Sequence, residues 1–145
     1  MKDLERAIAC RDAMYARDLA SQKLQIDVAI PKPGSAEATM TITDEMLNGF
    51  GICHGGYVFT LADTAFAFAC NAYDRITVAA GASIDYLKPV HGGDELRASA
   101  REIHRGVRAG LYKVSVHNQE DALVAVFQGR SSEWGKSLLN DPNQA

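Results

Sequence analysis

The chain of 145 residues has no excess of basic side chains, and this absence excludes two kinds of partner. Fifteen Lys and Arg stand against eighteen Asp and Glu, which gives a formal net charge of -3 at pH 7. Proteins that bind nucleic acid or an anionic membrane surface usually carry clustered positive charge. We therefore expect neither nucleic acid nor a membrane as a partner.

Long apolar runs and paired cysteines are also absent. Asp63 interrupts the longest apolar stretch, and the residues from Met1 to Glu5 carry acids where a signal peptide needs a basic flank. The three cysteines form no C-x-x-C pair, and their odd number is typical of free thiols in a reducing compartment. These features predict a cytoplasmic protein.

Nothing in the sequence divides the chain into separate units. It contains no internal repeat, no low-complexity run and no linker rich in Pro, Gly and Ser. With 47% hydrophobic residues, it is long enough to bury a core of its own. We predict one domain over residues 1–145, with an amphipathic N-terminal helix over residues 1–23 and a loose tail over residues 136–145.

Alternating apolar and polar residues predict a sheet built on both sides of one helical segment. The predicted strands cover residues 24–30, 36–42, 75–87, 95–102, 111–118 and 122–128. The first two flank a turn rich in Pro and are expected to form a hairpin, and the last is almost continuously apolar and therefore central. This order predicts an α+β domain in which a mostly antiparallel sheet wraps one long helix.

The apolar helical segment carries one charged residue. Asp63 is the only formally charged residue between Glu45 and Asp74, and on helical spacing its neighbours are Thr60 and three apolar side chains. Burial without a cation raises the pKa of a carboxyl group toward the range suited to a general base. The alternative is structural: Asp63 caps a neighbouring loop or hydrogen-bonds Asn48.

A glycine-rich turn from Asn48 to Gly56 ends where this helix is expected to begin. Free backbone N–H groups and the positive end of the helix dipole make such a place suitable for an oxyanion or a phosphate. Gly55 and Gly56 allow a ligand to approach the backbone closely, although both also fit a plain helix start.

The spacing of these two features limits how they can act together. Eight residues of helix separate Gly55 from Asp63 by about 12 Å, which is too far for both to contact one reacting carbon. If both are catalytic, Asn48 and Gly55 of one subunit must face Asp63 of another across a two-fold interface. We therefore predict a homodimer.

Four motifs in this order resemble a known family. They are Asn48-Gly49, Cys53-His54-Gly55-Gly56, Leu61-Ala62-Asp63-Thr64-Ala65 and Ile84-Asp85-Tyr86-Leu87-Lys88-Pro89. Together they resemble the PaaI group of hot-dog-fold acyl-CoA thioesterases, of the phenylacetate-degradation type, over roughly residues 11–135. The resemblance implies a five- or six-stranded antiparallel sheet around one helix, dimers with a continuous sheet, and tetramers that are dimers of dimers.

The resemblance also implies roles for single residues and a reaction. Asp63 corresponds to the carboxylate that activates water or attacks the thioester, the Gly55 N–H to the donor that polarises the carbonyl, and Asn48 to a polar group beside them. His54 and Thr64 belong to the same motifs, but His54 equally fits a brace for the turn and Thr64 a bond to its own helix. The implied reaction is hydrolysis of an arylacetyl-CoA, either phenylacetyl-CoA or a ring-hydroxylated form.

Coenzyme A carries phosphates, so basic and hydroxyl groups are expected near the pocket. The candidates for binding substrate or CoA are Gly56, Lys88, Arg105, Arg108, Arg130 and Ser131. Tyr57, Phe59 and Phe66 are the aromatic side chains nearest the expected acyl site. Because coenzyme A is part of the substrate, we expect no cofactor, and the three histidines other than His54 lack metal-ligand spacing.

Other chemistries are less well supported by the sequence, and two functions stay open beside hydrolysis. No G-x-S-x-G motif is present, and Cys53 as a thiol nucleophile conflicts with adjacent side chains pointing in different directions. A hot-dog hydratase or dehydratase needs His54 or His104 close to Asp63. A non-catalytic acyl-CoA-binding dimer would keep the pocket without turnover.

Overall fold

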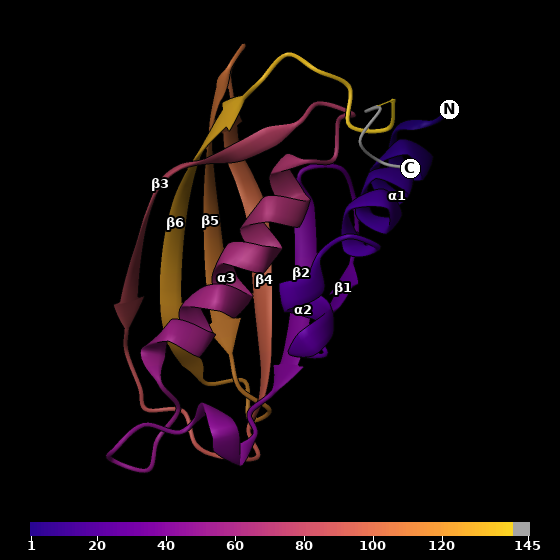
Figure 1. The fold of residues 1–145 in the computed structure, drawn as a ribbon. Coiled ribbons are helices and arrows are strands. Elements are labelled where there is room, and N and C mark those ends of the chain that lie inside the picture. Colours follow the sequence, from indigo (N-terminus) through magenta and orange to yellow (C-terminus); the bar gives the residue numbers. More distant parts are fainter. Residues whose placement is uncertain (141–145) are drawn as a thin grey trace.

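A six-stranded antiparallel sheet curves around one long helix in the computed structural model, which describes residues 1–140 (Figure 1). The helices are α1 (Asp3–Tyr15), α2 (Leu19–Lys23), the short 3-10 helix η1 (Asp44–Met46) and α3 (Gly55–Cys70). The strands are β1 (Asp27–Ala29), β2 (Ser35–Thr41), β3 (Thr77–Tyr86), β4 (Glu95–Arg105), β5 (Ala109–His117) and β6 (Leu123–Glu133). Their order across the sheet is β1-β2-β4-β5-β6-β3, and the predicted α+β architecture is confirmed.

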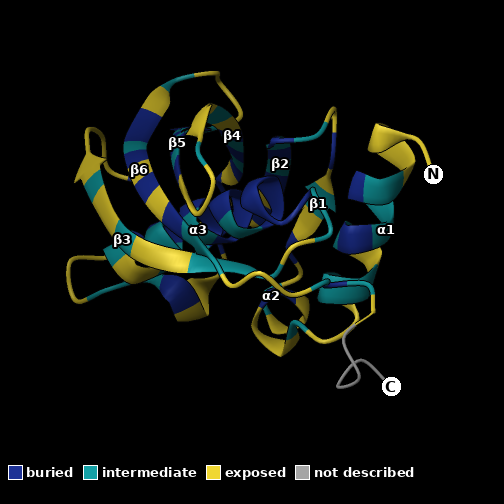
Figure 2. Cartoon of the chain, turned by 90° about the horizontal axis from the view of Figure 1, so that it is seen from above, coloured by how far each residue is buried: buried dark blue, intermediate teal, exposed yellow. Residues whose placement is uncertain are grey.

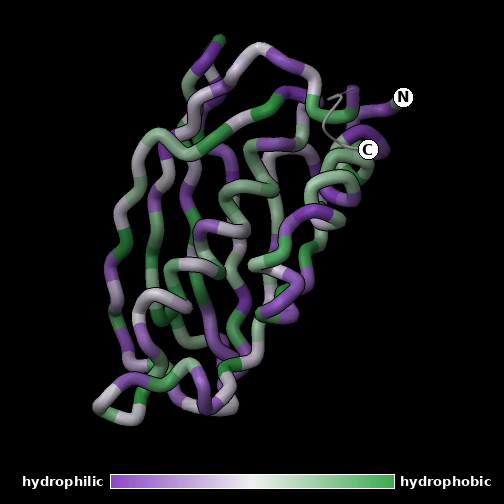
Figure 3. The backbone as a smooth tube through the Cα atoms, in the orientation of Figure 1, coloured by the Kyte–Doolittle hydropathy of each residue, from purple (hydrophilic) through white to green (hydrophobic). Residues whose placement is uncertain are grey.

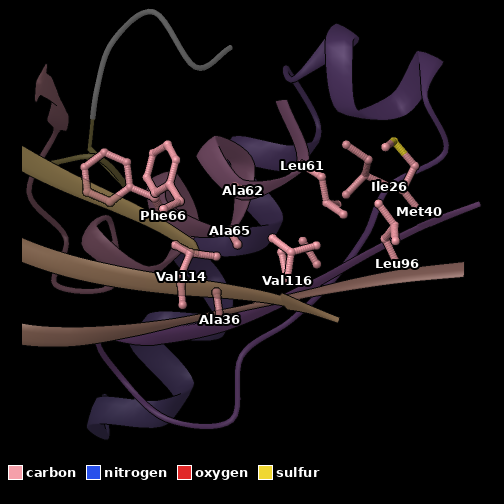
Figure 4. Close-up of a cluster of buried hydrophobic side chains, with 14 of the residues drawn as sticks. Ile26, Ala36, Met40, Leu61, Ala62, Ala65, Phe66, Leu96, Val114 and Val116 are labelled. Carbon is pink, nitrogen blue, oxygen red and sulfur yellow. The ribbon is translucent and has the colours of Figure 1, made fainter. Parts of the chain in front are cut away.

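Helix α3 is the centre of the core. Its sequence is apolar on nearly every side, and an all-round apolar helix is stable only when it is covered. Leu61, Ala65 and Phe66 lie beside Val114 and Val116 of β5, so the inner face of the sheet packs directly on the helix (Figure 4). The single buried helix predicted from the sequence is therefore confirmed.

The strands that cover α3 alternate between buried and solvent-facing residues. Along β5, Tyr112, Val114 and Val116 are buried, as their spacing predicts, and Figure 3 shows the matching alternation of hydropathy along the strands. Strand β6 lies between β5 and β3, so it is paired on both sides as its apolar sequence indicates, but it is next to the edge and not at the centre of the sheet as predicted. It extends to Glu133, five residues beyond the predicted end, because it pairs with both neighbours over that length.

One edge of the sheet is long and unpaired in the described chain. Strand β3 pairs only with β6, whereas the opposite edge strand, β1, has three residues. The exposed positions of β3 are mostly small, with Ala79, Ala80, Ala82 and Ser83 facing solvent (Figure 2). Asp85, near its end, is the one charged residue of β3. A long edge strand with so little charge and no covering element is a template for pairing with another strand.

The N-terminal helix predicted over residues 1–23 is divided in two. Helix α1 ends at Tyr15 and α2 begins at Leu19. The Asp18 carboxylate accepts a bond from the Ser21 N–H at 2.9 Å and another from the Ser21 hydroxyl at 2.6 Å. This side-chain cap starts a new helix, so α2 is not a continuation of α1.

The predicted loose tail is partly anchored. The Asp74 carboxylate accepts hydrogen bonds from the Leu139 N–H at 2.7 Å and from the Ser137 hydroxyl at 2.8 Å, and Leu138 is buried. Burial acts to raise the pKa of Asp74, but these hydrogen bonds outweigh it and lower the pKa below its usual value. Residues 136–140 are thus held, and the rest of the predicted tail, 141–145, lies outside the described residues.

Asn71 joins the end of α3 to the start of β3, and its replacement by alanine is expected to destabilise the fold. Its buried amide donates to the Ala67 and Thr77 carbonyls, both at 2.9 Å, and accepts from the Thr77 N–H at 2.9 Å. Asn71→Ala removes the partners of the Thr77 N–H and carbonyl, while the Ala67 carbonyl keeps its bond from the N–H of residue 71 at 3.2 Å. The substitution should lower the free energy of unfolding by about 3 kcal/mol.

Urea denaturation at one fixed protein concentration measures this effect. The exposed Gln128→Thr on β6 is the control, and its free energy of unfolding should stay within about 0.5 kcal/mol of the wild type. Equal losses in both variants would contradict the role given to Asn71.

Candidate active site

An open pocket of about 510 Å³ lies where the N-terminus of α3 meets the end of β3. Its lining residues are Asn48, Ile52, Cys53, Gly55, Val58, Tyr86, Leu87, Lys88, Pro89, Val90 and Val124. The structure therefore brings together three of the predicted site residues, Asn48, Gly55 and Lys88. The remaining lining is mostly apolar and includes no carboxylate.

Gly55 supplies a backbone donor to this pocket. It is the first residue of α3, and no group of residues 1–140 accepts a hydrogen bond from its N–H. The next two N–H groups, of Gly56 and Tyr57, donate to the His54 side chain and carbonyl at 2.9 and 3.0 Å. A free N–H at the positive end of a helix is suited to stabilising a developing oxyanion.

Tyr86 is a site residue that the sequence analysis missed. Its hydroxyl donates to the Gly55 carbonyl at 2.9 Å, which ties the end of β3 to the start of α3. A Cβ on Gly55 would lie 2.9 Å from Tyr86 Cζ, so the contact requires glycine. Burial raises the pKa of Tyr86, which keeps its hydroxyl a donor. Its only signal in the sequence was its place in the motif of residues 84–89.

Asn48 holds the loop that forms one wall of the pocket. Its side-chain oxygen accepts from the Phe50 N–H at 2.9 Å and from the Ile52 N–H at 3.3 Å. The loop carries Phe50 at its tip, where 91% of the side chain is exposed. Asn48 therefore shapes the backbone beside Gly55, and it is not bonded to Asp63 as the structural alternative supposed.

Asp63 lies on the same helix as Gly55 but does not line the same pocket. The side chain is half-buried, and within residues 1–140 it accepts no hydrogen bond and forms no ion pair. Burial raises the pKa of Asp63 above its ordinary value. Because α3 is continuous, the separation of about 12 Å between Gly55 and Asp63 holds within one chain.

His54 and Thr64 use their polar atoms to hold α3. The Nδ1 atom of His54 accepts from the Gly56 N–H at 2.9 Å, which caps the helix. The Thr64 hydroxyl donates to the Thr60 carbonyl at 2.7 Å. These are the structural alternatives given for both residues, and no bond within the described chain joins His54 or the exposed His104 to Asp63, as a hydratase would require.

None of the other candidates for binding coenzyme A lines the Gly55 pocket. Arg105, Arg108 and Ser131 line a small cavity beside Cys70, at the far end of α3. Arg105 pairs with Glu133 at 3.0 Å and its guanidinium stacks 4.0 Å above the Tyr73 ring. Two further candidates have local contacts: Arg130 donates to the Ala80 carbonyl at 3.4 Å, and Gly56 bonds His54.

Cys53 faces the pocket but is a poor nucleophile. Burial raises the pKa of its thiol to about 11, so that the thiolate is scarce at neutral pH. Its Sγ atom lies 3.4 Å from the His54 carbonyl rather than beside the imidazole. This arrangement agrees with the sequence-based argument against thiol catalysis.

The described part of the chain contains neither a cluster of metal ligands nor a membrane-spanning helix. Among residues 1–140, no group of three or more His, Cys, Asp or Glu side chains is placed to hold a metal ion. No helix within that range has the length and apolar character needed to cross a membrane.

Comparisons with known proteins cover both the pocket and α3. Residues 50–125 match the family described as the thioesterase superfamily. The acyl-coenzyme A thioesterase PaaI of Escherichia coli is 43% identical over 129 residues, which are 89% of this chain and 92% of that protein. The structure of the E. coli PaaI protein from the phenylacetic acid degradation operon superimposes with a TM-score of 0.91 and 41% identity, covering 94% of this chain and 99% of that one. A Streptococcus mutans protein solved with acetyl CoA has a TM-score of 0.74 and 31% identity, covering 77% and 90%.

Proposed function

Because this chain belongs to the thioesterase superfamily and is an acyl-CoA thioesterase, we propose that its substrate is an arylacetyl-CoA, either phenylacetyl-CoA or a ring-hydroxylated form. The predicted resemblance to the PaaI group is confirmed by the relatives just described. The proposal of an aryl substrate rests on the lining of the Gly55 pocket, which is mainly aliphatic with one aromatic ring, that of Tyr86. Such a lining favours a compact apolar acyl group over a polar one.

The proposed reaction uses the Gly55 N–H and the Asp63 carboxylate on one thioester. The N–H donates to the carbonyl oxygen, where negative charge develops as the tetrahedral intermediate forms. Asp63 either takes a proton from the attacking water or attacks the carbonyl carbon itself, giving an anhydride that water then hydrolyses. In both routes the C–S bond breaks, the sulfur leaves as a thiolate that is then protonated, and the products are the free acid and coenzyme A.

We infer that the site is completed by a second copy of the chain. The Gly55 pocket has no carboxylate among its lining residues, and Asp63 of the same chain is about 12 Å along α3. The open edge of β3, with its small exposed residues, suits antiparallel pairing with the same strand of another copy. This pairing would extend the sheet and bring the two α3 helices to one interface, and a dimer of such dimers follows from the family resemblance.

Thiol release from a panel of thioesters tests the proposed substrate. We expect kcat/KM for phenylacetyl-CoA to exceed that for acetyl-CoA and octanoyl-CoA by about tenfold or more, since a fitted apolar group is worth that much when the completed site covers it. A thiol reagent follows the reaction, and 4-hydroxyphenylacetyl-CoA shows whether the ring hydroxyl is accepted. Equal or faster hydrolysis of the straight-chain substrates would overturn the aryl assignment and leave the thioesterase activity in place.

A further inference from the structure

A second pocket, which we call the Trp134 pocket, lies at the end of the molecule where β3 begins. It has a volume of about 320 Å³ and is lined by Arg75, Val107, Arg108, Glu133, Trp134 and Gly135. These residues come from the α3–β3 loop, the β4–β5 turn and the chain at the end of β6. Thr77 of β3 pairs with Glu133 of β6, which places the pocket beside the first residue of the open edge strand.

The side chains of this pocket combine an aromatic surface with positive charge. The Trp134 side chain is 60% exposed although it belongs to the pocket wall. The one carboxylate in the lining, Glu133, is paired with Arg105 at 3.0 Å. Arg75 and Arg108 form no ion pair with any group of residues 1–140. Arg75 acts on the Asp74 carboxylate through charge alone, without an ion-pair contact, so both guanidinium groups can still contact a ligand. Two such groups beside an indole fit a planar base that carries phosphates.

The backbone around Trp134 is held in place before any ligand binds. The Trp134 N–H donates to the Ile76 carbonyl at 2.9 Å, and the Ile76 N–H donates to the Lys136 carbonyl at 2.9 Å. The Glu133 N–H donates to the Arg108 carbonyl at 2.7 Å, which fixes the β4–β5 turn against β6. A wall that is already ordered loses little conformational entropy when a ligand is bound.

We propose that the Trp134 pocket binds the adenine nucleotide end of the acyl-CoA substrate, with the base stacked on Trp134 and phosphates on Arg75 and Arg108. This inference rests on the proposed function. Antiparallel pairing of β3 with its copy places the Thr77 end of one subunit beside the Tyr86 end of the other. The Trp134 pocket of one subunit then lies at the same end of the dimer as the Gly55 pocket of the other subunit. A single coenzyme A can therefore cross the interface, with its thioester in one pocket and its nucleotide in the other.

Fluorescence tests nucleotide binding directly, because Trp134 is the only tryptophan of the chain. Titrating the wild-type protein with adenosine 3′,5′-bisphosphate should quench the emission in a saturable way, since a stacked purine contacts the indole. Pantetheine, which lacks the nucleotide, should cause no quenching. Arg108→Gln should weaken the affinity for the bisphosphate by about tenfold, as expected for the loss of one charged phosphate contact. Absence of saturable quenching would overturn the proposal.

Kinetics then tests whether this nucleotide is that of the substrate. In Trp134→Ala the ratio of KM for phenylacetyl-CoA to KM for phenylacetyl-pantetheine should rise about tenfold over the wild type. Leu19→Ala, which removes an exposed side chain of α2, should leave the ratio unchanged. An unchanged ratio in Trp134→Ala, even with quenching by the bisphosphate, would overturn the assignment to acyl-CoA. If the wild type hydrolyses neither thioester, the proposed function fails, and the titration still tests the pocket.

Discussion

Asp63→Asn is expected to lower kcat for phenylacetyl-CoA hydrolysis by a factor of at least ~100. The amide is nearly isosteric with the carboxylate but neither accepts a proton from water nor attacks a carbonyl carbon. The effect should fall on kcat more than on KM, because the side chain acts on the reacting atoms and not on the bulk of the substrate. Thiol release under saturating substrate measures kcat for both proteins.

The matched control for this variant is Glu120→Gln, which makes the same carboxylate-to-amide change at an exposed turn. Its kcat should equal that of the wild type. Size-exclusion chromatography of all three proteins shows whether the assembly is retained. If Asp63→Asn keeps most of the wild-type kcat while its assembly is intact, Asp63 is not the group that activates water or attacks the thioester.

The same substitution has a predictable effect on stability. Burial raises the pKa of Asp63 above its ordinary value, so the folded chain binds more protons than the unfolded chain between the ordinary and the raised pKa. The free energy of unfolding of the wild type therefore falls as pH rises through that window. The Asp63→Asn variant does not show this fall, because the amide does not titrate. Thermal unfolding should show the variant at least as stable as the wild type at pH 7, with a smaller difference near pH 4. Correspondingly, the pKa that the acid limb of the wild-type kcat–pH profile reports should be higher than the ordinary pKa of an aspartate.

The periodicity of apolar residues was sufficient to predict the core of the fold. It did not predict features that depend on single side-chain hydrogen bonds. Helix α3 and strand β5 could be predicted because burial imposes a regular apolar pattern on consecutive residues. The break before α2 depends on one side-chain cap from Asp18, which competes with continuation of the helix. The anchoring of residues 136–140 depends on Asp74, which is 65 positions from Leu139 in the sequence. Such a distant contact leaves no local pattern.

The candidate site divides in the same way. Asp63 and Gly55 could be singled out because a lone carboxylate in an apolar helix and glycines at a helix start are local chemical features. Tyr86 could not, because its contact with Gly55 joins residues 31 positions apart and depends on where β3 ends. The basic residues could not be sorted either, since the pairing of Arg105 with Glu133 forms only when β4 and β6 are brought together across β5.

Gly55→Ala is expected to lower kcat/KM for acyl-CoA hydrolysis by about 100-fold, although the backbone N–H is chemically unchanged. The added Cβ would lie 2.9 Å from Tyr86 Cζ and 3.0 Å from its hydroxyl oxygen. Either the Tyr86 ring leaves its place or the start of α3 shifts, and both changes turn the N–H away from the thioester oxygen. The control is Gly49→Ala in the same loop, where a Cβ meets no atom within 4 Å; its activity should stay close to that of the wild type.

A double-mutant cycle separates crowding at Tyr86 from any other cause of that loss. In a Tyr86→Ala background the ring that the new Cβ would strike is absent, so adding Gly55→Ala should cost far less than it does in the wild type. Tyr86→Ala alone should reduce activity less than Gly55→Ala, because the donor at Gly55 remains at the helix start with space around it. If Gly55→Ala costs the same in both backgrounds, the close approach of Tyr86 is not the reason that this position requires glycine, and the reason must lie in the space that the substrate itself occupies.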